Sequence, residues 1–251
     1  MIAIIRAASG EELKQLVLRY SSDPRLGVQQ ALKTAAKRNA RQEAEDERLN
    51  RLYARIDSAP NQAIIVGIDE VGRGALAGPL LVAAVVLPAH PRLAGLNDSK
   101  QLTADQRIKL AARIRELATA IGFGWVEAAQ IDRSGMALAM RQAIQAALDQ
   151  LDLEPDQVLL DGRPLAVHPR ELAIVGGDGT EAPIAAASVI AKVTRDAWMI
   201  AADKEYPGYG FAANKGYGSA AHLAALRTIG PSAIHRRTFL TAIFNTQDSL
   251  F

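Results

Sequence analysis

The fold of this chain is decided by the stretch Ile64-Ile65-Val66-Gly67-Ile68-Asp69-Glu70-Val71-Gly72-Arg73-Gly74. Its apolar, largely β-branched first half predicts a buried strand, and the Gly-Arg-Gly that follows predicts a tight turn. Two adjacent carboxylates therefore fall at a strand end, beside glycine backbone that can approach a ligand closely. An isolated Asp-Glu pair is usually a solvated turn, so the function of this pair depends on what the rest of the chain supplies.

Two further acids occupy similar positions. Asp161 follows the apolar run Val158-Leu159-Leu160, and Asp178 lies in a Gly-rich segment just before a predicted helix. Taken singly, Asp161 would be read as an ordinary turn and Asp178 as part of a helix-capping loop. Four carboxylates converging without His or Cys are the ligands that Mg²⁺ or Mn²⁺ prefers, and their mutual repulsion is relieved when a cation binds. The predicted metal ligands and catalytic acids are Asp69, Glu70, Asp161 and Asp178.

The adjacency of Asp69 and Glu70 sets a geometric condition. Successive strand residues point to opposite faces, so both acids reach one site only if regular strand geometry ends at Glu70. Asp69 is therefore the stronger candidate for a ligand that bridges two ions. Two divalent ions about 4 Å apart would clamp the attacking and leaving oxygens of a phosphodiester.

Composition restricts the class of protein. The chain has 251 residues, 49% of them hydrophobic, a net charge of +2 and no cysteine. Disulfides, thiolate catalysis and cysteine zinc sites are excluded, and a reducing compartment fits. No apolar run approaches the ~20 residues of a membrane span. We expect a soluble, cytoplasmic protein without a membrane partner, monomeric by default.

The first 60 residues differ in character from the rest. They carry eleven Lys/Arg and eight Asp/Glu among good helix formers. Asp23-Pro24 is a helix start signal, and a helical pattern runs from Leu26 to Ile56. We therefore predict a helical N-terminal extension over 1–60, a catalytic domain with C-terminal helices over 61–240, and a tail over 241–251.

The pattern beyond residue 63 is α/β. Strands are predicted at 63–69, 80–87, 120–127, 157–161 and 173–175, and helices at 103–119, 131–149, 183–206 and 219–228. Three early strands followed by strand–helix alternation predict a mixed sheet flanked by helices.

At this point the sequence resembles the ribonuclease HII family. The resemblance covers about residues 63–240 and rests on motifs in the family's order. These are Gly67-Ile68-Asp69-Glu70-Val71-Gly72-Arg73-Gly74, Leu96-Asn97-Asp98-Ser99-Lys100, Leu160-Asp161-Gly162, Ala186-Ala187-Ser188-Val189-Ile190-Ala191-Lys192, Asn214-Lys215-Gly216-Tyr217-Gly218 and Ile234-His235-Arg236. The Gly-Arg-Gly turn is similar to that of ribonuclease HII rather than HIII. The helical extension also resembles one found on some bacterial members.

The resemblance implies a ribonuclease H-like fold and a two-metal phosphodiester hydrolase. Such an enzyme cuts the RNA strand of RNA–DNA hybrids and nicks duplex DNA 5′ to a single ribonucleotide, leaving 3′-hydroxyl and 5′-phosphate ends, in ribonucleotide removal and DNA repair. It implies metal binding by the four acids already chosen. It also implies that the Gly-Arg-Gly turn and a tyrosine read the ribonucleotide junction through its 2′-hydroxyl, the group that distinguishes RNA. The candidate substrate-binding residues are Gly72, Arg73, Gly74, Ser99, Lys100, Lys192, Lys215 and Tyr217.

The last residues, Gln247-Asp248-Ser249-Leu250-Phe251, resemble the peptide by which bacterial proteins bind the sliding clamp. Gln247, Leu250 and Phe251 are the candidate partner-binding residues, since such a peptide inserts its apolar end into a groove. A tail that packs back on its own domain is the alternative. For the whole chain, the alternative to an enzyme is a catalytically inactive nucleic-acid-binding or clamp-associated adaptor on the same fold. A nucleotide-binding module is disfavoured because the glycine-rich loop lacks a phosphate-loop pattern.

Overall fold

The structure is a computed structural model that describes residues 1–244, and the predicted clamp-binding residues lie outside them. The chain forms two compact units, Met1–Arg51 and the residues from Leu52 onwards. The helix α3 (Leu26–Ser58) continues across this division. The predicted domain boundary near residue 60 therefore stays a prediction.

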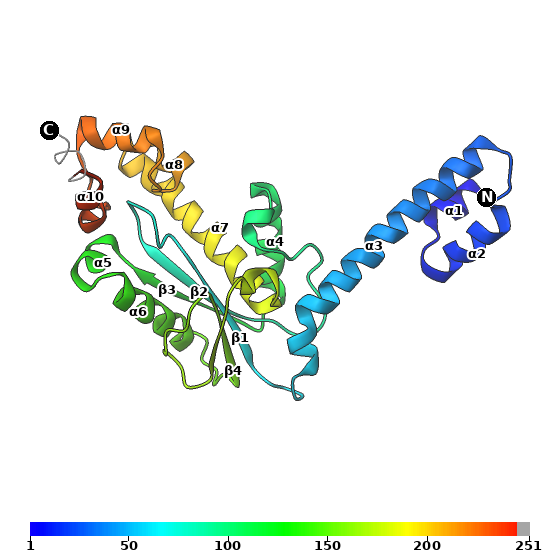
Figure 1. Cartoon of the computed structure of the whole chain (residues 1–251), viewed down its shortest axis with the longest axis horizontal. Coiled ribbons are helices and arrows are strands. Elements are labelled where there is room, and N and C mark those ends of the chain that lie inside the picture. Colours follow the sequence, from blue (N-terminus) through cyan, green and yellow to red (C-terminus); the bar gives the residue numbers. More distant parts are fainter. Residues whose placement is uncertain (245–251) are drawn as a thin grey trace. The chain divides into compact units, whose positions relative to one another are not determined.

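The first unit is helical. It contains α1 (Ile2–Ala7), α2 (Gly10–Tyr20) and the first part of α3, which lie together in Figure 1. Apolar side chains at helical spacing form its small core, and these are Ile5, Ala8, Leu13, Val28, Ala31, Leu32 and Ala35. The helix predicted from Leu26 is confirmed and runs two residues beyond Ile56.

The second unit is built on the predicted mixed sheet. Its strands are β1 (Ile65–Val71), β2 (Leu80–Val86), β3 (Ala120–Val126), β4 (Gln157–Asp161) and β5 (Glu171–Ile174). Their order in the sheet is β3-β2-β1-β4-β5. The β1–β2 and β2–β3 pairs are antiparallel, whereas β4 runs parallel to both β1 and β5. The fifth strand begins two residues before the predicted range.

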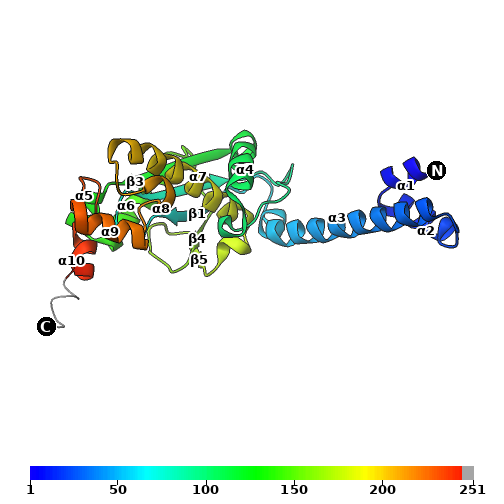
Figure 2. The same ribbon diagram turned by 90° about the horizontal axis from the view of Figure 1, so that it is seen from above.

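Helices cover both faces of this sheet (Figure 1). On one face lie α5 (Ala128–Ser134) and α6 (Met136–Asp149), which pack on the main apolar core. On the other lie α7 (Ala182–Glu205) and α4 (Ala104–Leu117). The short helices α8 (Phe211–Asn214), α9 (Ala220–Ile229) and α10 (Arg237–Phe244) gather at one end of the unit in both views (Figure 2). Two 3₁₀ turns, Ser99–Gln101 and Gly177–Gly179, carry predicted site residues.

The single helix predicted over 131–149 is wrong, because two helices meet at Gly135. This glycine has φ +75° and ends α5 before α6 begins. A left-handed φ is easily reached only by glycine, so the position turns the chain between the two helices.

The close approach of β1 to α7 depends on Gly67. A Cβ there would lie 2.0 Å from the carbonyl carbon of Pro183 and 2.2 Å from the amide nitrogen of Ile184. Both atoms belong to the backbone at the start of α7, so the helix sits directly against the strand. Glycine is therefore required for this packing, which brings the segment before α7 next to the end of β1.

Candidate metal centre and cleft

Strand alternation sends Asp69 and Asp161 to the same face of the sheet. Val66 and Ile68 belong to the core under α6, so the alternate residues Gly67 and Asp69 face α7. β4 runs parallel to β1, and the pair Ile68–Leu160 directly precedes the two acids. Neighbouring parallel strands end at the same edge, so the two carboxylates come side by side.

A third acid joins them from the turn before α7. Asp69, Asp161 and Asp178 each offer a carboxylate oxygen, and these oxygens lie within 4.8 Å of one another. The amide of Gly177 donates to Asp161 at 2.8 Å, which ties the 3₁₀ turn to the end of β4. Asp69 and Asp178 are each only 7% exposed, so three acids meet in a nearly buried site.

The electrostatics of this cluster favour a bound cation. Burial, followed by the charges of Glu70 and Asp161, raises the pKa of Asp69 to about 8. Burial and the neighbouring Asp178 also raise the pKa of Asp161. Raised pKa values mean that ionised carboxylates are unfavourable here without a counter-charge. Oxygen ligands in this number and proximity fit Mg²⁺ or Mn²⁺.

Within the protein, Lys100 supplies a partial counter-charge. Its ammonium lies 2.8 Å from Asp178 and 3.6 Å from Asp98. The hydrogen bond to Asp178 raises the pKa of Lys100. The lysine side chain is 75% exposed.

The geometric condition set for Glu70 is not met, because regular pairing continues through Val71. Glu70 lies outside the three-acid cluster, but its charge is close enough to raise the pKa of Asp69. Burial raises the pKa of Glu70, and Arg73 approaches its carboxylate to 3.5 Å. Glu70 still lines the same cleft as Asp69. The strand continues to Val71 and ends before Gly72, which has φ +87°.

This cleft, about 340 Å³ in volume, contains most of the predicted substrate-binding residues. Those at its wall are Gly72, Arg73, Gly74, Ser99, Lys100, Lys192 and Tyr217, beside Asp69, Glu70 and Asp161. Lys215 is not among its lining residues; its ammonium donates to the carbonyl of Ala212. Lys192 is paired with Asp196 at 2.9 Å.

Two residues predicted to recognise the ribonucleotide junction, Gly72 and Tyr217, contact each other directly. The amide of Gly72 donates to the hydroxyl of Tyr217 at 3.2 Å, and the tyrosine ring lies over the guanidinium of Arg195. A Cβ at Gly72 would meet Arg195, whereas a Cβ at Gly74 would meet no atom within 4 Å. Packing therefore explains the first glycine and does not explain the second.

Several side chains that shape the cleft were missed from sequence. The hydroxyl of Ser188 forms a hydrogen bond to the carboxylate of Asp69, and its oxygen lies 2.8 Å from the hydroxyl oxygen of Ser99. Ser99 is thus buried and engaged within the protein. Arg195 and Arg236 are fully buried and donate to main-chain carbonyls of the Gly-Arg-Gly loop and its surroundings. The signal available in the sequence was a charged residue within an apolar helix, as with Arg195.

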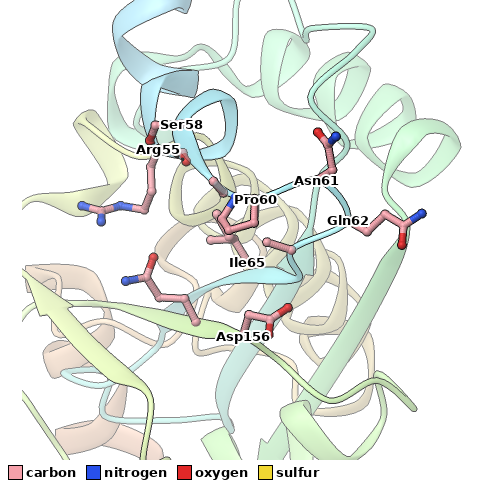
Figure 3. Close-up of a pocket in the computed structure, with 10 residues that line it drawn as sticks. Arg55, Ser58, Pro60, Asn61, Gln62, Ile65 and Asp156 are labelled. Atoms are coloured by element: carbon pink, nitrogen blue, oxygen red, sulfur yellow. Dashed lines mark hydrogen bonds between the residues drawn. The ribbon is translucent and has the colours of Figure 1, made fainter.

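A larger hollow of about 530 Å³ lies elsewhere, at the amino end of β1 (Figure 3). Ile65, which lines it, is four residues before Asp69, or about 13 Å along a strand. Its one acidic lining residue, Asp156, accepts from the amide of Ile64 at 2.9 Å. The hollow therefore has no converging carboxylates and is separate from the acid cluster.

His235 is buried, and its ring lies against that of His222. Met140 lies in the core and Met136 packs against it. Among the described residues, no helix combines the length and apolar character needed to cross a bilayer.

Comparison with known proteins identifies relatives over most of the chain. The family model for ribonuclease HII matches residues 66–242, and the model for the ribonuclease HII N-terminal domain matches residues 3–54. Ribonuclease HII of Enterococcus faecalis is 44% identical over 222 residues, covering 88% of this chain and 87% of the relative.

Solved structures resemble the fold. Ribonuclease H2 from Pyrococcus horikoshii aligns with a TM-score of 0.60 at 28% identity, covering 70% of this chain and 93% of that one. The ribonuclease HII in the PCNA complex from Archaeoglobus fulgidus aligns with the same score at 25% identity, covering 69% and 93%. The predicted mixed sheet flanked by helices is thus shared with these proteins.

Proposed function

Because this chain belongs to the ribonuclease HII family, we propose that it nicks duplex DNA on the 5′ side of a single embedded ribonucleotide, leaving 3′-hydroxyl and 5′-phosphate ends. As a family member it is a ribonuclease H, an enzyme that hydrolyses phosphodiester bonds in RNA–DNA substrates. The finer proposal makes it the enzyme that starts ribonucleotide removal in DNA repair. The observation that carries it is the convergence of three carboxylates, two of which line the cleft that contains the Gly72–Tyr217 contact.

The catalytic part of the proposal assigns metal binding to the acids. Asp69, Asp161 and Asp178 would hold Mg²⁺ or Mn²⁺, and Glu70 would complete the set from the cleft wall. Two ions bound there would stabilise the charge on the attacking and leaving oxygens of the phosphodiester. Ser188 and the amide of Glu70 both donate to Asp69 and so fix its direction.

The recognition part assigns the reading of the sugar to the loop after β1. Gly74 has open space where a side chain would stand, so the main chain there can approach a 2′-hydroxyl. The exposed Arg73 and the cleft lysines Lys100 and Lys192 would hold neighbouring phosphates. The ring of Tyr217 would pack on the deoxyribose that follows the ribonucleotide. Ser99 would contribute through its main chain, and Lys215 would contact the backbone outside the cleft.

The proposal is tested with a labelled DNA duplex containing one ribonucleotide, beside an all-DNA duplex and an RNA–DNA hybrid. We expect nicking 5′ to the lone ribonucleotide in Mg²⁺ or Mn²⁺, no cutting in chelator and no cutting of the all-DNA duplex. Cutting of the long hybrid alone would contradict the single-ribonucleotide specificity. Binding without cutting of any substrate would favour the adaptor function.

For the tail we propose binding to the bacterial sliding clamp through Gln247, Leu250 and Phe251. Support comes from the motif and from the Archaeoglobus fulgidus relative, whose solved complex contains PCNA. Removing Leu250 and Phe251 should lower clamp affinity at least about tenfold, because these apolar residues would fill the groove. The measurement is surface plasmon resonance on immobilised clamp, with the removal of Met1 and Ile2 as control. Unchanged affinity would reject the proposal.

The remaining expectations stay predictions. They are the extension over 1–60, the catalytic domain over 61–240, the monomeric state and the cytoplasmic location. The second compact unit holds every acid of the cluster, which agrees with placing catalysis after residue 60.

A further inference from the structure

A buried pair of histidines lies behind the cleft, outside the catalytic machinery proposed above. His222 is in the first turn of α9 and His235 precedes α10, and they are 0% and 2% exposed. Their Nε2 atoms are 3.0 Å apart. Tyr209 and Phe211 surround the rings with aromatic contacts. Neither histidine lines the cleft, and both are buried.

The contacts of the two rings fix their protonation. His222 Nδ1 lies 2.9 Å from the carbonyl oxygen of Tyr217, which can only accept, so Nδ1 carries the hydrogen. In the neutral ring its Nε2 must then accept from Nε2–H of His235. The remaining nitrogen of His235, Nδ1, accepts from the amide of Ser232 at 2.9 Å. One tautomer of each ring therefore satisfies every bond.

An additional proton would break this chain of hydrogen bonds. If His222 were cationic, its Nε2–H would face the Nε2–H of His235. To avoid this, His235 would have to lose its only ring hydrogen, because its Nδ1 already accepts from Ser232. Burial lowers the pKa of His222, and burial together with His222 lowers the pKa of His235 to about 4. Both rings are accordingly neutral near pH 7, in the tautomers that the contacts require.

The chain of hydrogen bonds ends on the main chain of Tyr217. The carbonyl of Tyr217 also accepts from the amide of Ser219 at 2.8 Å, and its amide donates to Asn214 at 3.0 Å. At the other end of the side chain, the hydroxyl accepts from Gly72. The direction of the ring is thus set from behind by His222 and in front by the Gly-Arg-Gly loop.

The second histidine connects the same network to that loop. Next to His235, the carbonyl of Ile234 accepts from the amide of Gly78 at 2.8 Å, and the amide of Arg236 donates to Leu76 at 2.9 Å. Residues 76–78 follow the Gly-Arg-Gly turn after one intervening residue, Ala75. The pair therefore joins the bend before α9, which carries Tyr217, to the segment that follows Gly72, its hydroxyl partner.

We infer that His222 and His235 are positioning residues for substrate selectivity, which fix the ring of Tyr217 against the sugar that follows the ribonucleotide. This inference rests on the proposed function of Tyr217. The pair acts only through the tyrosine, so its loss should change which substrate is preferred more than it changes metal binding by the acids.

The test compares kcat/KM for the single-ribonucleotide duplex with kcat/KM for the continuous RNA–DNA hybrid. His222→Phe keeps a ring but removes the donor, and we expect the ratio to fall about tenfold because the tyrosine shifts. His222→Asn, whose amide can donate where Nδ1 does, should keep the ratio within about threefold of wild type. His90→Phe, at an exposed histidine, is the matched control. Calorimetric Mn²⁺ affinity should be unchanged in all three.

Tyr217→Ala distinguishes a failure of the proposed function of Tyr217 from a failure of the inference about the histidines. If this variant leaves the ratio unchanged, the proposed function of Tyr217 is wrong. If Tyr217→Ala lowers the ratio while folded His222→Phe does not, the inference about the histidines is wrong. Equal losses in His222→Phe and His222→Asn would also overturn it, since the restored donor would then be irrelevant.

A spectroscopic measurement on the wild-type protein tests the hydrogen bonds of the two histidines even if His222→Phe does not fold. The chain has four histidines, so their ¹⁵N signals can be assigned by comparing variants. At pH 7 we expect His222 as the Nδ1–H tautomer and His235 as the Nε2–H tautomer, both neutral. The opposite tautomers, or a cationic ring at that pH, would overturn the inference.

Discussion

Replacement of Asp69 by Asn should lower kcat for ribonucleotide cleavage by about 10³-fold or more, because a ligand facing both other carboxylates is lost. The amide keeps the size of the side chain but not its charge. The assay is single-turnover nicking of the one-ribonucleotide duplex in Mg²⁺. Asp105→Asn, at a 72% exposed carboxylate on α4, should retain wild-type activity. An Asp69→Asn enzyme with a tenth of normal activity would refute the metal-binding role.

The same substitution should stabilise the metal-free protein. An acid whose folded pKa is raised keeps its proton in the folded state and loses it on unfolding. The stability contributed by Asp69 is therefore complete below its unfolded pKa near 3.8 and is lost as pH rises towards about 8. We expect Asp69→Asn to gain about 3 kcal/mol over wild type at pH 7 in chelator, and much less at pH 4. Added Mn²⁺ should stabilise the wild type and reduce this difference.

Replacement of Gly67 by Ala should destabilise the second unit by about 3 kcal/mol or more, because the new methyl group would overlap the backbone of Pro183 and Ile184. A backbone cannot swing aside as a side chain can, so α7 must move away from β1. The movement would also carry the turn that holds Asp178. Calorimetric Mn²⁺ affinity should therefore fall together with stability.

Urea unfolding, monitored by tryptophan fluorescence, measures this loss of stability in the second unit. Both tryptophans, Trp125 and Trp198, belong to it. Gly74→Ala is the matched control, since a methyl group there meets no atom within 4 Å, and its change should stay within about 0.5 kcal/mol. If Gly67→Ala unfolded at the wild-type urea concentration, the contact between strand and helix would be looser than the structure has it.

Local patterns predicted the elements of this fold well. The strand over 157–161 and the helix from Leu26 were predicted correctly. In both, the spacing of the apolar residues and the residues that mark the boundary lie within a few positions of each other in the sequence. The same information correctly predicted that Asp161 ends a strand, whereas the strand that carries Asp69 continues to Val71. The break at Gly135 was missed although Ser134-Gly135 is a stop signal, because the apolar period continues on both sides of it.

Contacts between distant residues were beyond such patterns. Nothing local shows that Ser188 bonds Asp69 or that His222 meets His235, because each partner was brought by a different element. The extension of β1 past Glu70 depends on the neighbouring strand, where Val71 pairs with Leu81. The resemblance supplied candidate residues, but the burial of Ser99 and the position of Lys215 outside the cleft follow only from packing.

The mixed sheet also sets the time at which this site can exist during synthesis. β1 and β2 follow each other in the chain and pair with each other. By contrast, the hydrogen bond between Ile64 and Asp156, next to the β1–β4 pair, joins residues 92 positions apart. Loops of that length close late, after local hairpins have formed. A nascent chain that ends before residue 161 carries Asp69 without either neighbouring acid. The nuclease centre is thus assembled only when most of the polypeptide has left the ribosome.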